Sequence, residues 1–119
     1  MSLKILVVDD SQTDRDKLTS IVNSKGYMVV TANTGAEGIE LAKKEMPDLI
    51  FLDIVMPGES GYGACRTIKK DPITKDIPVY FVTSKNQKAD HVMGGMQGAS
   101  GHIGKPFSED EILQVLAKF

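Results

Sequence analysis

The segment KILVVDD, at residues 4–10, is the strongest indication of how this chain folds. Its apolar residues run without a break into Asp9 and Asp10, and a second apolar run, at residues 49–52, leads in the same way into Asp53. Continuous apolar runs of this length are typical of strands buried inside a parallel sheet. In open sheets of that kind, ligands bind just beyond the carboxyl ends of the strands. The two runs therefore predict a parallel sheet with three acidic side chains at one edge.

Two further segments add a hydroxyl group and an ammonium group to that edge. The apolar run at residues 79–82 leads into Thr83, and a short segment at residues 100–104 leads into Lys105. Three carboxylates at close range resist being ionised together unless a cation lies among them, so this set favours a hard divalent ion. The three aspartates are therefore candidate metal ligands.

Helical patterns alternate with the strands along the chain. Strands are expected at residues 4–8, 28–32, 49–53, 77–83 and 100–104. Helices are expected at residues 13–24, between Thr34 and Pro47, between Ser60 and the polar loop at 71–76, at 87–95, and from Ser108 through Phe119. Five strand–helix units with short connections imply a doubly wound α/β fold, with helices on both faces of a five-stranded parallel sheet. No internal repeat or linker divides the sequence, so residues 1–119 are expected to form one domain.

Capping residues and apolar stripes indicate some of the helices strongly and others weakly. The pairs Thr34 with Glu37 and Ser108 with Glu111 have the spacing of a capping box. The helix after Ser108 carries an apolar stripe that should face the core, made of Ile112, Val115, Leu116 and Phe119. The inward residues of the helix after Thr34 are expected to be Ile39, Ala42 and Met46. Gly94 lies in the helix at 87–95, which has the weakest helix propensity.

The composition bounds the class of protein. The chain has 119 residues, of which 41% are hydrophobic, and this is enough to fill one core. Its formal net charge of −2 gives no basic surface for nucleic acid. Because no apolar run resembles a signal peptide or a membrane span, a cytoplasmic protein without membrane insertion is expected. Cys65 is the only cysteine, which excludes a disulfide framework and indicates a small thiol that is packed or half-exposed.

Four motifs, taken in order, resemble the CheY-like receiver domain of bacterial two-component response regulators. They are VVDDS at 7–11, LDIVMPG at 52–58, VTS at 82–84 and KP at 105–106. The resemblance covers the whole chain and implies a flavodoxin-like sheet with the strand order 2-1-3-4-5. Within the family, TSKNQ at 83–87 with QGA at 97–99 resembles stand-alone receivers of type IV pilus, or twitching-motility, chemosensory systems.

The resemblance also implies a ligand set for Mg²⁺. Asp10 would bind the ion directly and Asp9 largely through water, while Asp53 and the backbone carbonyl group of Val55 would contribute as well. Mg²⁺ prefers oxygen ligands and keeps several of its waters, which suits a site rich in carboxylates and free of sulfur.

The same resemblance assigns the chemistry to three residues. The carboxylate of Asp53 would attack the phosphorus of a phosphohistidine on a histidine kinase. Lys105 would pair with Asp53 and then with the phosphoryl oxygens, and a cis peptide bond between Lys105 and Pro106 would turn its ammonium group toward Asp53. Thr83 would donate its hydroxyl group to the phosphoryl group. The expected function is that of a monomeric stand-alone response regulator, whose only reactions are its own phosphorylation and dephosphorylation. A downstream protein target and a role as a phosphate sink both suit this sequence.

The sequence departs from the family pattern at positions of the conformational switch and of the face that binds partners, which together are called the output surface here. His102 stands three residues before Lys105, where the family generally has a tyrosine or phenylalanine, and Ser84 stands where a small apolar residue is common. Five glycines loosen the face that receivers typically present to partners, at positions 94, 95, 98, 101 and 104. An imidazole at position 102 titrates near neutrality, so it is expected either to make the output surface sensitive to pH or to face solvent without effect.

Two other classes of protein share parts of this pattern. A phosphohydrolase of the haloacid dehalogenase type also forms an aspartyl phosphate. Enzymes of this type, however, typically have a second aspartate, which acts as acid and base, two residues after the nucleophile. Val55 occupies that position and cannot transfer a proton. A flavodoxin-like electron carrier would need a phosphate-binding loop after the first strand, where Asp9 and Asp10 would repel a flavin phosphate. Neither alternative is favoured.

Overall fold

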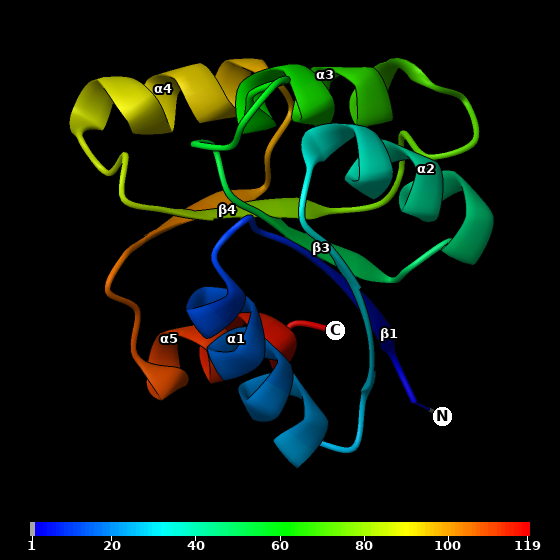
Figure 1. The fold of residues 1–119 in the computed structure, drawn as a ribbon, viewed down its shortest axis with the longest axis vertical. Coiled ribbons are helices and arrows are strands. Elements are labelled where there is room, and N and C mark those ends of the chain that lie inside the picture. The colour runs from blue at the N-terminus through cyan, green and yellow to red at the C-terminus, as the bar shows by residue number, and fades with distance from the viewer. Residues whose placement is uncertain (1) are drawn as a thin grey trace.

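In the computed structural model, which describes residues 2–119, one parallel sheet lies between two layers of helices (Figure 1). The strands are β1 (Lys4–Val8), β2 (Met28–Ala32), β3 (Leu49–Leu52), β4 (Val79–Thr83) and β5 (Gly101–Gly104). The helices are α1 (Gln12–Ser24), α2 (Gly35–Glu45), α3 (Gly61–Lys70), α4 (Lys88–Met96) and α5 (Glu109–Leu116). Helices α1 and α5 cover one face, and α2, α3 and α4 cover the other (Figure 1). The strand order is β2-β1-β3-β4-β5, which confirms the predicted doubly wound fold.

The core has one half on each side of the sheet because successive strand residues point to opposite faces. Val7 and Phe51 pack toward α1 and α5, whereas Val8 and Leu52 pack on the other side. Cys65 belongs to the second half and is fully buried, and this burial raises the pKa of its thiol to about 11. Of the packed and the half-exposed thiol that the sequence allows, the structure shows the packed one.

The strand register aligns the ends of β1 and β3. Val8 lies opposite Leu52, and the backbone N–H of Asp53 donates to the carbonyl oxygen of Val8 at 2.9 Å. The residues that follow these strands, Asp9 and Asp53, consequently leave the sheet side by side. At the same edge of the sheet, the N–H of Lys105 donates to the carbonyl oxygen of Thr83 at 2.9 Å, which fixes the chain after β5 against β4.

The predicted caps of the helices are present. The hydroxyl group of Thr34 accepts a hydrogen bond from the N–H of Glu37, and Ser108 forms a full capping box with Glu111. Ser11 caps α1 by accepting from the N–H of Asp14, so this helix begins at Gln12, one residue earlier than expected. No helix within residues 2–119 combines the length and the apolar character that a bilayer crossing requires.

Two residues expected in the core are exposed. Met46 ends α2 in the left-handed region, with φ of 46°, and this turn directs its side chain outward, where 49% of the residue is exposed. Phe119 is 45% exposed because α5 ends at Leu116, so the stripe that faces the core stops before it. Its ring instead forms a T-shaped pair with the ring of Tyr80, with 6.4 Å between the ring centroids.

Candidate functional site

The three predicted aspartates meet at the carboxyl edge of the sheet. Asp9 and Asp53 follow β1 and β3 and are only 1% and 5% exposed, whereas Asp10 is exposed. One carboxylate oxygen from each residue lies within 4.8 Å of the others. Oxygen donors at this spacing are a suitable ligand set for a hard divalent ion such as Mg²⁺. The residues present therefore fit the predicted cation.

Lys105 reaches this cluster from the same edge of the sheet, where it follows the outer strand β5. Its ammonium nitrogen lies 2.8 Å from Asp9 Oδ2 and 3.0 Å from Asp53 Oδ2. The peptide bond between Lys105 and Pro106 is cis, as the resemblance implies. A third carboxylate, from Asp14, contacts the same ammonium group at 2.8 Å. One cation is thus shared by three acids.

The electrostatics of the cluster follow from burial and from these contacts. Burial alone would lower the pKa of Lys105, but hydrogen bonds to Asp14, Asp9 and Asp53 outweigh it and raise that pKa above its ordinary value. Burial raises the pKa of Asp9, and the hydrogen bond from Lys105 only partly offsets this effect. The ammonium group therefore stays charged, and the crowded acids favour further positive charge.

The loop after β3 folds over the side chain of Asp53. The N–H of Val55 donates to Asp53 Oδ1 at 3.3 Å, while the side chain of Val55 is exposed. Gly61, at the start of α3, is required here because a Cβ atom would collide with the backbone of Asp53 and Ile54. The two carboxylate oxygens of Asp53 thus have different partners. Oδ1 accepts a hydrogen bond from the loop, and Oδ2 accepts one from the ammonium group of Lys105.

Thr83 connects this edge to the side of the molecule formed by α4 and β5. The residue is fully buried, and its hydroxyl oxygen accepts a hydrogen bond from the N–H of Lys85 at 3.2 Å. The carbonyl oxygen of Lys85 in turn accepts from Nε2 of His102 at 2.7 Å. Two hydrogen bonds through one residue therefore join Thr83 to His102.

The ring of His102 lies against α4. It stacks on the ring of His91, with 4.1 Å between centroids, and its Nδ1 atom is buried without a hydrogen-bond partner. Burial lowers the pKa of His102, and the positive charge of a protonated His91 lowers it further, while the carbonyl group of Lys85 and the carboxylate of Asp90 act in the opposite direction. The ring is therefore partly buried and packed against His91, and its effect on the output surface stays a prediction.

A comparison with protein families identifies this architecture. The family model described as the response regulator receiver domain matches residues 5–117. The chain belongs to this family. The two alternative classes considered from the sequence, a phosphohydrolase and an electron carrier, are thereby set aside.

Individual receiver proteins are similar over nearly the whole chain. Protein PilH of Pseudomonas aeruginosa is 43% identical over 113 residues, which cover 95% of this chain and 93% of PilH. Response regulator PleD of Caulobacter vibrioides is 38% identical over 109 residues, but these cover only 24% of PleD. The solved structure of chemotaxis protein CheY4 of Vibrio cholerae covers 99% of this chain and 98% of its own, with a TM-score of 0.93 and 29% identity. The chain is therefore a response regulator receiver domain similar to PilH.

The sequence patterns did not reveal every residue at this receiver site. Asp14 belongs to none of the four motifs, and the stacking of His91 on His102 joins residues from different elements. The one available signal for Asp14 is its place in the first turn of α1, which begins directly after the acid pair. A first turn in that place lies at the same edge of the sheet as the predicted site.

Proposed function

We propose that the carboxylate of Asp53 accepts a phosphoryl group from a phosphohistidine of a partner histidine kinase in a Mg²⁺-dependent reaction. The observation that carries this proposal is the placement of Asp53, a buried carboxylate that contacts Lys105 at 3.0 Å and lies within 4.8 Å of two further acids. Phosphoryl transfer depends mainly on positioning and on neutralising charge at the equatorial oxygens. A fixed carboxylate beside an ammonium group and a cation site meets both needs.

The reaction requires one bond to form and one to break. An oxygen of Asp53 forms the new bond to phosphorus while the phosphorus–nitrogen bond of phosphohistidine breaks, and the electron pair stays on the histidine nitrogen. Lys105 then contacts the phosphoryl oxygens, and Thr83 donates its hydroxyl group to one of them. Attack by water later releases phosphate, so the protein catalyses only its own phosphorylation and dephosphorylation.

The cation would be held by the side chains of Asp9, Asp10 and Asp53 and by the backbone carbonyl group of Val55. When bound there, Mg²⁺ supplies positive charge that stabilises the developing charge on the phosphoryl oxygens. The burial of Asp9 beside Asp53 supports this role, because two close carboxylates are costly without a cation.

Phosphorylation would alter the surface at α4 and β5 through Thr83. If the hydroxyl group of Thr83 turns to the phosphoryl group, it no longer accepts the hydrogen bond from the N–H of Lys85. Lys85 would then be free to shift, and with it His102, which donates to the carbonyl oxygen of Lys85. This change biases a two-state surface toward one partner-binding form. Similarity to PilH over 95% of the chain supports a role in pilus chemosensory signalling, either through a downstream protein or as a phosphate sink. Kinases that consume ATP act in the cytoplasm, where this function would place the protein.

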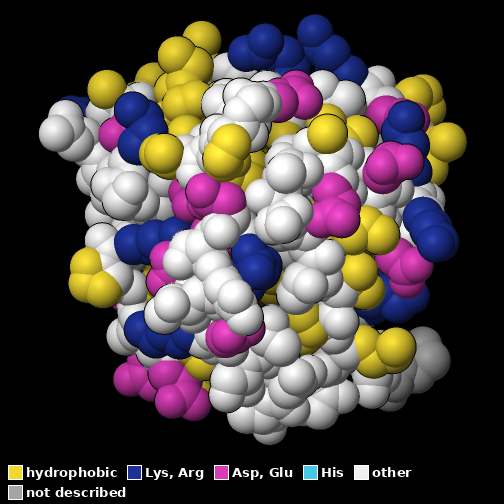
Figure 2. Space-filling model, in the orientation of Figure 1, with side chains coloured by type: hydrophobic (Ala, Val, Ile, Leu, Met, Phe, Trp, Pro, Cys, Tyr) yellow, Lys and Arg dark blue, Asp and Glu magenta, His cyan; other side chains and the backbone are white. Residues whose placement is uncertain are grey.

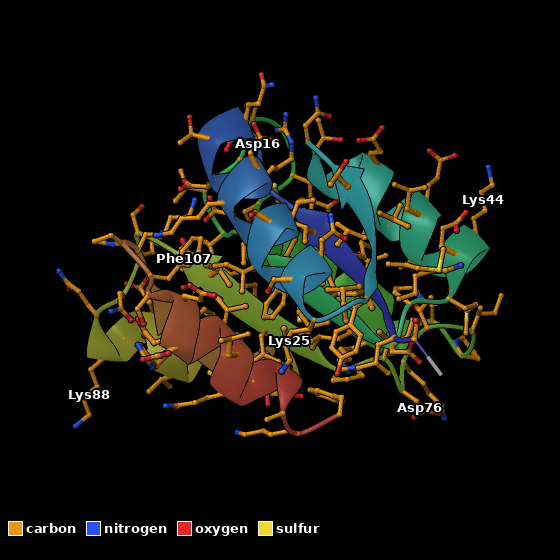
Figure 3. All side chains as sticks on the ribbon, turned by 90° about the horizontal axis from the view of Figure 1, so that it is seen from below. Asp16, Lys25, Lys44, Asp76, Lys88 and Phe107 are labelled. Atoms are coloured by element: carbon orange, nitrogen blue, oxygen red, sulfur yellow. The ribbon has the colours of Figure 1, made fainter. Side chains whose placement is uncertain are left out.

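The test is labelling by a small phosphodonor such as phosphoramidate, followed by intact-mass spectrometry. We expect the wild type to gain one phosphoryl group with Mg²⁺ present and none with EDTA, and Asp53→Asn to gain none. Asp76→Asn is the matched control, since Asp76 is an exposed aspartate in the loop before β4, at the opposite edge of the sheet (Figure 3). Normal labelling of Asp53→Asn contradicts the assignment.

A further inference from the structure

The ammonium group of Lys105 has one partner that the proposed reaction does not use. Asp53 is the acceptor and Asp9 is a metal ligand, but Asp14 has neither role. Its Oδ2 atom nevertheless lies 2.8 Å from Lys105 Nζ, as close as the oxygen of Asp9 and closer than that of Asp53 at 3.0 Å. The side chain of Asp14 is 30% exposed and that of Lys105 is 15% exposed, so the pair is partly shielded from water.

The backbone of Asp14 is held firmly at the site. Its N–H donates to the hydroxyl oxygen of Ser11, the residue that caps α1. The next residue, Arg15, donates from its guanidinium group to the carbonyl oxygen of Asp9 at 2.8 Å. The first turn of α1 is thus tied at two points to the end of β1. The backbone position from which the carboxylate of Asp14 reaches Lys105 is thereby fixed at the site.

We propose that Asp14 is a positioning residue that holds the ammonium group of Lys105 on the α1 side of the site and thereby slows phosphoryl uptake at Asp53. This inference rests on the proposed function. In the unphosphorylated protein, three carboxylates share one ammonium group. Phosphorylation replaces the single charge of Asp53 by a group with about two charges and three strong acceptor oxygens. Lys105 must then turn toward those oxygens, and the contact with Asp14 opposes that movement.

The expected size of the effect follows from the exposure of the pair. Ion pairs that remain in contact with solvent change an equilibrium by a factor of about five at most. Removing the charge of Asp14 should therefore accelerate uptake about threefold. A variant that only damaged the fold would lower both phosphoryl uptake and the binding of a phosphoryl mimic, so an increase in both distinguishes positioning from structural damage.

The experiment compares four proteins at saturating Mg²⁺. Rates of phosphoryl uptake from phosphoramidate are measured by intact mass, and binding of beryllofluoride, a phosphoryl mimic, is measured at equilibrium. Asp14→Asn should take up the group about threefold faster than the wild type and bind beryllofluoride correspondingly tighter. Asp14→Glu keeps the charge and should return both values close to those of the wild type. Asp16→Asn removes an exposed charge elsewhere on α1 (Figure 3) and should change neither value.

A second comparison tests whether Asp14 acts through Lys105. In a Lys105→Met background, Asp14→Asn should no longer accelerate uptake, because the group that Asp14 positions is gone. Equal rates for Asp14→Asn and the wild type, or an undiminished acceleration in the Lys105→Met background, overturn the role of Asp14 while leaving phosphorylation of Asp53 intact. A wild type that takes up no phosphoryl group overturns the proposed function itself, and the role of Asp14 with it.

Discussion

The acidic edge of the sheet and the corner formed by α4 and β5 differ in how their polar groups are paired and how their space is filled. At the acidic edge, Asp9 and Asp53 are buried, their oxygens have partners, and Lys105 joins them from across the sheet. At the corner, a hollow of about 210 Å³ is lined by residues that include Gly94, Gly95 and Gly101, and a buried ring nitrogen of His102 has no partner.

The surface above the corner differs as well. Exposed hydrophobic side chains on α4 belong to Val92, Met93 and Met96. Hydrophobic side chains gather over this helix at the upper left of Figure 2, while acidic and basic side chains are interspersed across the rest of the face in view. The two regions thus differ in composition, with paired charges at the acidic edge and glycines, stacked histidines and exposed hydrophobic side chains at the corner.

The largest contrast should appear in phosphoryl uptake. Lys105→Met removes the cation that, in the proposed reaction, would stabilise the transferring group, and we expect uptake from phosphoramidate to fall about 100-fold. His102→Phe changes the corner alone and should alter uptake by less than about twofold, since the ring of His102 reaches Thr83 only through Lys85. Intact-mass time courses measure both rates. A large loss in His102→Phe would break the separation between the two regions.

Metal binding should stabilise the acidic edge. Mg²⁺ at a hundredfold excess over its dissociation constant should raise the free energy of unfolding by about 2.7 kcal/mol, because it binds the native state and relieves the crowding of three carboxylates. Thermal melts with Mg²⁺ and with EDTA at matched ionic strength measure this shift.

Two variants test whether this stabilisation by Mg²⁺ arises at the acidic edge. Asp10→Ala should lose most of it, and His91→Ala, at the corner, should keep it. An unchanged shift in Asp10→Ala argues against a metal site at these acids.

One glycine from each region provides the next comparison. Gly61→Ala places a Cβ atom against the backbone of Asp53 and Ile54, which should lower the free energy of unfolding by about 2 kcal/mol. Gly95→Ala adds a methyl group in open space within α4 and should raise stability by about 0.5–1 kcal/mol. Urea unfolding measures both changes. Stabilisation of equal size at the two positions is the result that contradicts this difference in packing.

The smallest effect should be the pH dependence of the corner. Because burial lowers the pKa of His102 below its ordinary value of 6.5, the unfolded chain binds a proton there more readily than the folded protein does. The contribution of His102 to stability is therefore present above pH 6.5 and is lost as the pH falls through the lowered pKa. NMR titration of the ring gives that pKa directly, and unfolding experiments at pH 7.5 and 5.5 give its consequence.

His91 supplies the control for this titration. A protonated His91 lowers the pKa of His102, so His91→Gln should raise that pKa, and His102→Phe should show a weaker loss of stability on acidification than the wild type. Identical pH profiles for wild type and His102→Phe would show that the buried ring does not titrate in this range.

The ends of the strands could be predicted because they depend on local sequence. An apolar run that stops at a carboxylate defines both a buried strand and the point at which the chain leaves the sheet, and the positions of Asp9, Asp53 and Thr83 follow from it. The small errors have local causes too. β4 begins at Val79, just after Pro78, which has no N–H to donate to the sheet, and β3 ends before Asp53.

The set of elements, their order as strand–helix units and the acidic side chains at one edge of the sheet all follow from the amino-acid sequence alone. Three features follow only from the folded molecule: Asp14 contacts Lys105, His91 stacks on His102, and Phe119 lies outside the core. Periodicity within a segment shows which of its faces is buried and where the segment ends. Contacts between side chains of different elements depend in addition on helix placement and rotamers, and these are set by the packing of the whole molecule.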